Sequence, residues 1–266
     1  EALERHNVPL ELKYLPVIES ALNAKAKSPV GASGLWQFMV GTGKIYGLEV
    51  NSMVDERRDP RKASDAAARF LADLYKLYGD WHLVIAAYNC GPGNVAKALR
   101  IANGKRNFWE IYPYLPRETR SYVPLFIAAN YIMNFYEEHN MCPAVPLFSY
   151  ATDTVMISDR VHLQQIAEKV NISLDELKFL NPQYRYDIIP GNIKPYPLVV
   201  PFEHINSYAL NRDSILVYKP ELAKREIKFE PSEGEVIYYK VKSGDTLGGI
   251  AKKYRVSVNQ LKTWNN

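Results

Sequence analysis

Apolar residues recur at helical spacing through the first half of the chain, and this pattern predicts a mainly helical domain. Near the N-terminus, Leu12, Leu15 and Ile18 recur every third residue, which predicts a short helix that ends at Glu19. Pro16 lies inside this run and should kink the helix or mark a boundary, because proline lacks the backbone N–H. The pattern therefore predicts a carboxylate at a helix end.

Further apolar patterns predict helices downstream. One is expected over residues 64–79, with a Ser at its start that can cap it and a Gly at its end that can stop it. Another is expected over 94–99, with an Asn as its cap. The run 83–88 is short and apolar, which indicates a buried helix, and the stretch 119–136 predicts a long helix.

The pattern changes beyond Met141, where two prolines, at positions 143 and 146, indicate a hinge. An internal repeat follows, because residues 166–181 align without gaps with residues 250–265. The two copies share Leu163/Leu247, Ile166/Ile250, Ala167/Ala251, Ser173/Ser257, Leu177/Leu261 and Asn181/Asn265. Such regular identities predict two copies of one structural unit.

Each copy is predicted to form a short strand, two short helices and a second strand. In the second copy the opening strand is expected over 238–241, and the turn 243–246 should cap the helix that follows, as Ser257 should cap the next one. Residues 197–201 supply the closing strand of the first copy, whereas the sequence reaches residue 266 before any such strand in the second. The charged stretch 203–235 is expected to be a linker with some local strand content.

The composition is that of a globular protein and argues against several classes. The chain has 266 residues, of which 47% are hydrophobic and 23% are charged. Its net charge of +4 is spread evenly along the chain, whereas a nucleic-acid-binding domain usually concentrates positive charge. A run of about eighteen apolar residues is lacking, so no membrane span is expected. Cys90 and Cys142 could form one bridge or remain thiols, and no spacing of His and Cys predicts a metal or other cofactor.

Glu19 is the candidate for acid–base chemistry. It is followed by Ser20 and then by the stretch 31–39, which is rich in Gly and carries an amide, an indole and a thioether. A carboxyl group held against apolar and aromatic walls should keep its proton near neutral pH and so could act as a general acid. A Glu-Ser pair taken alone would more often be a surface carboxylate.

Four ordered motifs reverse that expectation: Glu19-Ser20, Gly34-Leu35-Trp36-Gln37, Ala87-Tyr88-Asn89-Cys90-Gly91 and Glu118-Thr119-Arg120-Ser121-Tyr122-Val123. Together they resemble the lytic transglycosylases of glycoside hydrolase family 23. The resemblance implies a mainly α, lysozyme-like catalytic domain that cleaves the β-1,4 bond between N-acetylmuramic acid and N-acetylglucosamine of peptidoglycan. In the family one Glu, matched here by Glu19, protonates the glycosidic oxygen and then takes the proton of the muramic C6 hydroxyl, which attacks C1 and closes a 1,6-anhydro ring.

The family uses the acetamido group of its substrate to stabilise the cation, one of the exceptions to hydrolysis by paired carboxylates. Asp55, Asp59 and Glu118 are therefore not assigned as a nucleophile, and Asp59 before Pro60 is typical of a helix start. The substrate-binding residues that the resemblance implies are Ser28, Gln37, Met39, Tyr88, Asn89 and Tyr122.

Several of these positions have a second interpretation from the pattern alone. Ser28 and Gln37 would more often face solvent, and Tyr122 would be a core residue, although it matches a family Tyr whose hydroxyl lies near the catalytic Glu. Trp36 is expected to pack rather than stack on a sugar. Asn89 is expected to hold its loop in place.

The repeated units resemble Lys-Met (LysM) modules, βααβ units that bind N-acetylglucosamine polymers. The second copy keeps Gly244-Asp245-Thr246 as its expected glycan-binding turn, whereas the first has residues 160–162 there and is expected to be degenerate. The predicted division is a catalytic domain at 1–148, a first module at 152–203, a linker at 204–235 and a truncated second module at 236–266.

The expected partners are peptidoglycan strands and N-acetylglucosamine oligomers, with no nucleic acid. The resemblance implies the bacterial periplasm or cell envelope, with outer-membrane attachment through a segment before Glu1. Two alternatives stay open: a hydrolase on the same site, as in goose-type lysozymes or chitinases, and a non-catalytic glycan-binding protein. Glu19 argues against the second, because binding alone requires no acid at that position.

Overall fold

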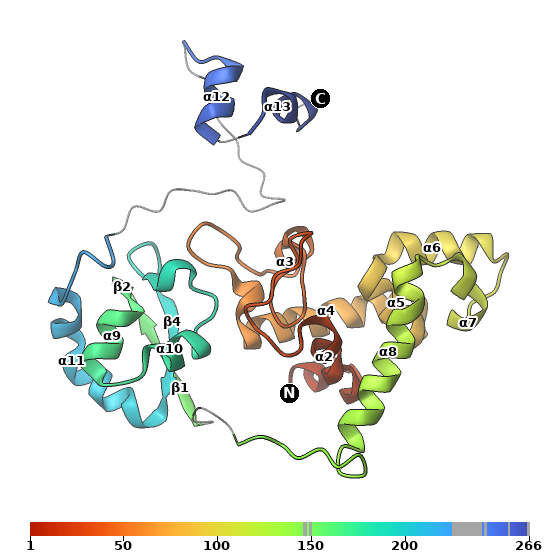
Figure 1. The fold of residues 1–266 in the computed structure, drawn as a ribbon, viewed down its shortest axis with the longest axis horizontal. Coiled ribbons are helices and arrows are strands. Elements are labelled where there is room, and N and C mark those ends of the chain that lie inside the picture. Colours follow the sequence, from red (N-terminus) through yellow and green to blue (C-terminus); the bar gives the residue numbers. More distant parts are fainter. Residues whose placement is uncertain (146–147, 149–150, 225–240, 242–243, 255, 265–266) are drawn as a thin grey trace. The chain divides into compact units, whose positions relative to one another are not determined.

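The computed structural model describes residues 1–145, 148, 151–224, 241, 244–254 and 256–264. The chain divides into two compact units, Glu1–Arg225 and Glu226–Asn266 (Figure 1). The larger unit has a helical part, which precedes residue 145, and a smaller part with strands. The mainly α fold of the first part and the small α+β fold that follows agree with the predicted fold class.

The helical part contains two long helices, α4 (Pro60–Tyr78) and α8 (Arg117–Asn134). The shorter elements are α1 (Ala2–Arg5), η1 (Leu10–Tyr14), α2 (Leu15–Ser20), α3 (Val40–Ile45), η2 (Glu56–Arg58), α5 (Trp81–Cys90), α6 (Pro92–Ile101), α7 (Phe108–Ile111) and η3 (Tyr112–Tyr114).

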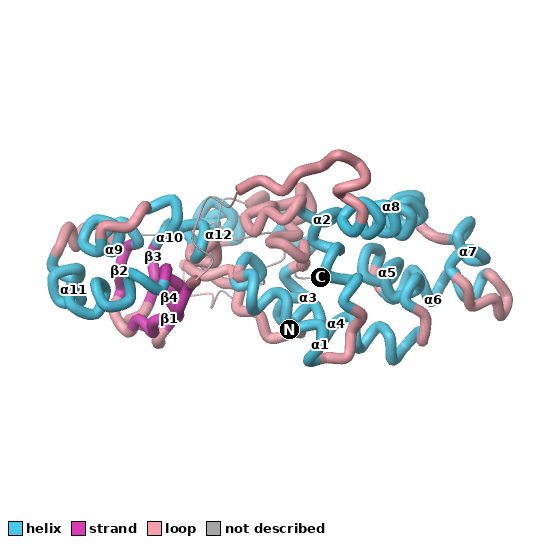
Figure 2. The backbone as a smooth tube through the Cα atoms, turned by 90° about the horizontal axis from the view of Figure 1, so that it is seen from below, coloured by secondary structure: helices cyan, strands magenta, loops and turns pink. Residues whose placement is uncertain are grey.

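Helix α5 lies in the core of this part. Its residues 83–87 are each at most 2% exposed, and the helix contacts α4, α6 and α8 (Figure 2). Burial on all sides explains why the sequence of α5 is an apolar run without a polar face. The predicted buried helix is therefore confirmed, and its last turn carries Tyr88 and Asn89.

The helix boundaries correct two predicted caps. Helix α4 begins at Pro60 rather than at Ser64, because the Asp59 carboxylate accepts hydrogen bonds from the N–H groups of the first turn at 2.9 and 3.0 Å. Helix α6 begins at Pro92 rather than at Asn94, since proline fits the first turn of a helix. The boundary predicted at Pro16 is confirmed, because η1 gives way to α2 there.

The smaller part of the larger unit is built from two antiparallel strand pairs and short helices. Strand β1 (Thr152–Ile157) pairs with β4 (Tyr196–Pro201), and β2 (Arg160–His162) pairs with β3 (Ile188–Pro190). The helices α9 (Leu163–Val170) and α10 (Leu174–Leu180) come between, followed by the short turn η4 (Arg185–Asp187). The order strand, helix, helix, strand is as predicted, and the β2–β3 pair is an addition.

The stretch 203–235 differs from its prediction. After η5 (Phe202–His204) it forms helix α11 (Ile205–Val217), which packs on α9 and buries Tyr208 and Ile215. These two residues are seven positions apart, two helical turns, a spacing too sparse to reveal a helix in a sequence pattern. The predicted strand content is wrong here, and residues 225–235 lie outside the described residues.

The smaller unit contains α12 (Leu247–Tyr254) and α13 (Val258–Trp264). The hydroxyl oxygen of Thr246 accepts a hydrogen bond from the Gly249 N–H at 3.0 Å, so the turn caps α12 as predicted. Helix α13 begins directly after Ser257, the predicted cap. Most of the opening strand predicted at 238–241 lies outside the described residues.

Candidate active site

Glu19 lies in the last turn of α2, and the residues after it fix that helix end. Ala21 adopts a left-handed conformation with φ of 49°, which stops the helix. Ser20 Oγ donates a hydrogen bond to the carbonyl of Leu35 at 2.9 Å. The end of α2 is thereby attached to the turn of residues 31–38, which contains the second motif.

Gly34 and Trp36 fix the shape of this turn. Gly34 has φ of +87°, and a Cβ at this position would lie 1.8 Å from the carbonyl oxygen of Arg57, so only glycine fits. Trp36 is buried at 4% exposure, and its indole N–H donates to Ser64 Oγ at 2.9 Å. Its burial agrees with the packing role predicted for it.

A buried ion pair holds both ends of the same turn. Arg57 Nε and Nη2 donate to the two carboxylate oxygens of Asp55 at 2.8 Å, and Nη1 donates to the carbonyls of Gly31 at 2.8 Å and Phe38 at 2.9 Å. Burial alone would raise the pKa of Asp55, but the hydrogen bonds and charge of Arg57, together with the charges of Arg185 and Arg58, hold that pKa below its usual value. The sequence pattern did not reveal Arg57, because a run of five charged residues, 55–59, is typical of a solvated surface.

The Glu19 carboxyl is partly buried and bonded to one tyrosine. Tyr122 Oη donates to Glu19 Oε1. Burial raises the pKa of Glu19 to about 7, the hydrogen bond from Tyr122 opposes this shift, and the charge of Glu118 adds to it. A carboxyl group with this pKa is about half protonated at pH 7 and can therefore both donate and accept a proton.

Tyr88 and Asn89 connect the remaining motifs. Tyr88 Oη donates to the carbonyl of Trp36 at 2.7 Å, and Asn89 Oδ1 accepts from Thr119 Oγ1 at 2.8 Å. Burial raises the pKa of Tyr88 and of Tyr122 well above the usual value, so both hydroxyls keep their protons. The structure thus joins all four motifs by direct hydrogen bonds. Asn89 was expected to hold a loop, but it lies in α5 and its side chain joins this helix to α8.

The other predicted site residues take several positions. Ser28 Oγ accepts from the Ala32 N–H at 3.0 Å, Gln37 Nε2 donates to the carbonyl of Gly34 at 2.8 Å, and Met39 is 46% exposed. Ser28 and Gln37 therefore stabilise the loop before and within the turn, and their contacts with a sugar stay predictions. The expected glycan-binding turn Gly244-Asp245-Thr246 belongs to the smaller unit, where Gly244 has φ of +93°.

The remaining candidate acidic and thiol groups form no hydrogen bond with Glu19 in the described structure. Asp59 caps α4, and Glu118 is exposed in the first turn of α8. Cys90 and Cys142 are both free thiols. In the part of the chain with described coordinates, no group of three or more His, Cys, Asp or Glu could hold a metal ion. Among the helices of that same part, none is long and apolar enough to cross a membrane.

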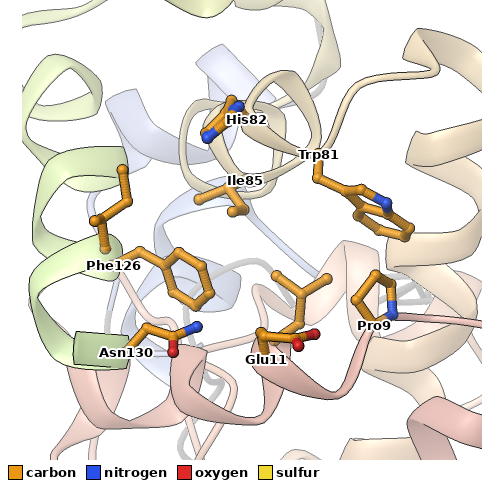
Figure 3. A pocket seen from close by; sticks show the side chains of 9 residues that line it. Pro9, Glu11, Trp81, His82, Ile85, Phe126 and Asn130 are labelled. Atoms are coloured by element: carbon orange, nitrogen blue, oxygen red, sulfur yellow. The ribbon is translucent and has the colours of Figure 1, made fainter. Parts of the chain in front are cut away.

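A separate pocket of about 270 Å³ opens on the helical part (Figure 3). Its walls include Trp81 and Ile85 of α5 and Phe126 of α8, with Glu11, His82 and Asn130 also around it. Ile85 precedes Tyr88 and Phe126 follows Tyr122 by about one helical turn each. None of the predicted site residues lines this pocket, so we do not assign the chemistry to it.

Comparisons with known proteins agree with the motifs. The family described as Transglycosylase SLT domain matches residues 1–111, the family described as Lytic transglycosylase MltD, LysM-like domain, matches 151–217, and the LysM domain family matches 239–266.

Two relatives and one solved structure show the extent of the similarity. Membrane-bound lytic murein transglycosylase D of Escherichia coli (strain K12) is 33% identical over 99% of this chain and 58% of its own length, so the chain spans less than two thirds of that relative. Soluble lytic murein transglycosylase of the same strain is 37% identical over 41% of this chain and 18% of its own length. A crystal structure of the 70-kDa soluble lytic transglycosylase from Escherichia coli aligns with a TM-score of 0.43 and 30% identity, over 51% of this chain and 24% of that one. The family matches thus identify a transglycosylase SLT domain in residues 1–111, followed along the chain by LysM-type domains in residues 151–217 and 239–266.

Proposed function

We propose that this protein is a peptidoglycan lytic transglycosylase that cleaves the β-1,4 bond between N-acetylmuramic acid and N-acetylglucosamine and leaves 1,6-anhydromuramic ends. The observation that carries the proposal is the Glu19 carboxyl, whose pKa is raised to about 7 and which is bonded to Tyr122. The names of the relatives support the substrate class.

Glu19 acts twice in the proposed mechanism. The protonated carboxyl first gives its proton to the glycosidic oxygen as the bond to C1 breaks. The resulting carboxylate then takes the proton from the muramic C6 hydroxyl as that oxygen bonds to C1, which restores the starting acid. A pKa near 7 suits both steps, because neither form of the group is then strongly favoured at neutral pH.

The surrounding residues have proposed supporting roles. Tyr122 orients the carboxyl through its hydrogen bond, and Ser28, Gln37, Met39, Tyr88 and Asn89 are proposed to form the sugar-binding surface. Two of the three carboxylates near the motifs are engaged elsewhere, Asp55 with Arg57 and Asp59 as a helix cap, which supports a single acid at this site. The turn Gly244-Asp245-Thr246 is proposed to bind N-acetylglucosamine polymers, and the cell envelope is the proposed location.

The decisive experiment is digestion of purified peptidoglycan sacculi, with mass analysis of the products. We expect muropeptides that are one water lighter than hydrolysis products and that lack a reducing end. The variant Glu19→Gln should lose cleavage by at least about 10²-fold, since it cannot donate the proton. Products with only reducing muramic ends would instead identify a lysozyme-type hydrolase.

A further inference from the structure

The LysM-like part of the larger unit is joined to the helical part by paired backbone. Val54 and Tyr184 form an antiparallel bridge, the Asp55 N–H donates to the carbonyl of Gln183 at 2.9 Å, and the Arg185 N–H donates to that of Met53 at 2.8 Å. Backbone pairing of this kind fixes both register and orientation. The two parts therefore share one continuous interface.

Side chains reinforce this interface at two points. Arg185 Nη2 lies 3.2 Å from the buried carboxylate of Asp55. Glu49 accepts from Tyr196 Oη at 2.7 Å and pairs with Lys194 Nζ at 2.7 Å. Asp55 is the same residue that binds Arg57, so the module is connected through one carboxylate to the turn of the active site.

The interface leaves a cavity of about 870 Å³ with walls from both parts. Residues 22–25, Leu35 and residues 59–62 form the catalytic side, while Phe179, Pro197 and Val199 are among the residues of the module side. This volume is within the usual range for binding sites of small molecules. The cavity is thus large enough to hold a ligand of several amino-acid residues.

The cavity begins where the Glu19 helix ends. Residues 22–25 follow α2 directly, and the carbonyl of Leu35 accepts the hydrogen bond from Ser20, the neighbour of Glu19. A substituent of the sugar bound at Glu19 could therefore enter the cavity without leaving the protein surface.

The charges of the lining favour an anionic ligand. Four cationic side chains and two carboxylates line the cavity: Lys25, Arg61, Lys62 and Lys178 against Asp59 and Asp175. Lys62 is already paired with Glu56 and Lys178 with Asp187, and Asp59 caps α4. The side chain of Lys25 is exposed, and among the residues that the structure describes it forms no ion pair.

We propose that this cavity binds the carboxylate-bearing peptide that is attached to N-acetylmuramic acid. The peptide carboxylates pair with Lys25, and the apolar walls, Phe179 among them, contact its side chains. This proposal rests on the proposed function, because it extends the same substrate from the sugar to its peptide. The LysM-like module would then select peptide-bearing strands for the active site.

The test compares cleavage of intact glycan strands with cleavage of the same strands after an amidase has removed their peptides. In Lys25→Ala and in Phe179→Ala we expect the ratio of kcat/KM for peptide-bearing to peptide-free strands to fall about three- to tenfold, the size of one partly solvated contact. The matched controls are Lys27→Ala, an exposed Lys two residues away, and Phe202→Ala, because Phe202 is 67% exposed and Phe179 61% exposed in the same module. Both controls should keep the wild-type ratio.

The cavity proposal would be overturned if all four variants kept the wild-type ratio of kcat/KM, or if the ratio fell equally in the two controls. A binding measurement separates this failure from a failure of the proposed function. Calorimetric titration of Glu19→Gln with an N-acetylmuramoyl peptide needs no cleavage, and Phe179→Ala in that background should weaken its binding about three- to tenfold. Unchanged affinity would also contradict the proposal, whereas a wild-type protein that cleaves neither substrate would contradict the proposed function.

Discussion

The variant Glu19→Gln should be inactive, yet at high pH it should be more stable than the wild type. The pKa of Glu19 is raised from 4.5 to about 7, so the folded state favours the protonated form. The stability that comes with this form is present below pH 4.5 and is lost as the pH rises through about 7. The two pKa values differ by about 2.5, so the free energy of unfolding falls by about 3 kcal/mol from a pH below 4.5 to a pH above 7. Gln is neutral at every pH and avoids this loss.

Urea unfolding of the wild type and of Glu19→Gln, at pH 4.5 and at pH 8, measures the effect. Tryptophan fluorescence reports mainly on the helical part, which contains Trp36, Trp81 and Trp109, three of the four tryptophans of the chain. The stability of the variant relative to the wild type should increase by about 3 kcal/mol from the lower to the higher pH. The exposed carboxylate of Glu11 provides the control, and Glu11→Gln should show no such increase. A difference that does not depend on pH would refute the raised pKa and with it the basis for Glu19 as the acid.

Two further predictions concern the neighbours of Glu19. Tyr122→Phe removes the hydrogen bond that lowers the pKa of Glu19, so the alkaline limb of the pH–rate profile should move to higher pH, and an unmoved limb would contradict the assigned contact. Arg57→Met leaves Asp55 buried without its main partner and should cost about 3 to 5 kcal/mol in urea unfolding. Arg5→Met, which breaks an exposed pair with Asp65, should cost at most about 1 kcal/mol, and equal losses in these two variants would contradict the role of burial.

The sequence predicted most of the helices, because their stability depends on apolar periodicity within one segment. The ordered motifs also contain Glu19 and Tyr122, whose side chains the structure joins by a hydrogen bond, and Gly34, which lies against the Arg57 carbonyl. The start of α4 was misjudged because the Ser64 hydroxyl is equally able to cap a helix or to accept from a distant indole, as it does from Trp36. Only the tertiary structure distinguishes these two uses.

The buried role of Arg57 could not be predicted from the sequence for a related reason. The charged run of residues 55–59 has the composition of an exposed loop, yet Asp55 and Arg57 are both at most 2% exposed. Burial of two charges is favourable only when they pair and their remaining hydrogen-bonding atoms find partners. Here those partners are carbonyls 26 and 19 residues away in sequence, a relation that no local pattern contains.

The donors of Arg57 explain how a short irregular turn can be buried beside the proposed acid. The carbonyls of Gly31 and Phe38 would each require a hydrogen-bond partner away from water. A guanidinium group supplies five donors in a rigid plane, enough to bind a carboxylate with two bonds and both carbonyls at once, whereas a lysine has three donors on a flexible chain. Because Ser20 is bonded to the Leu35 carbonyl within this turn, the position of Glu19 depends on a residue that takes no part in the proposed proton transfers.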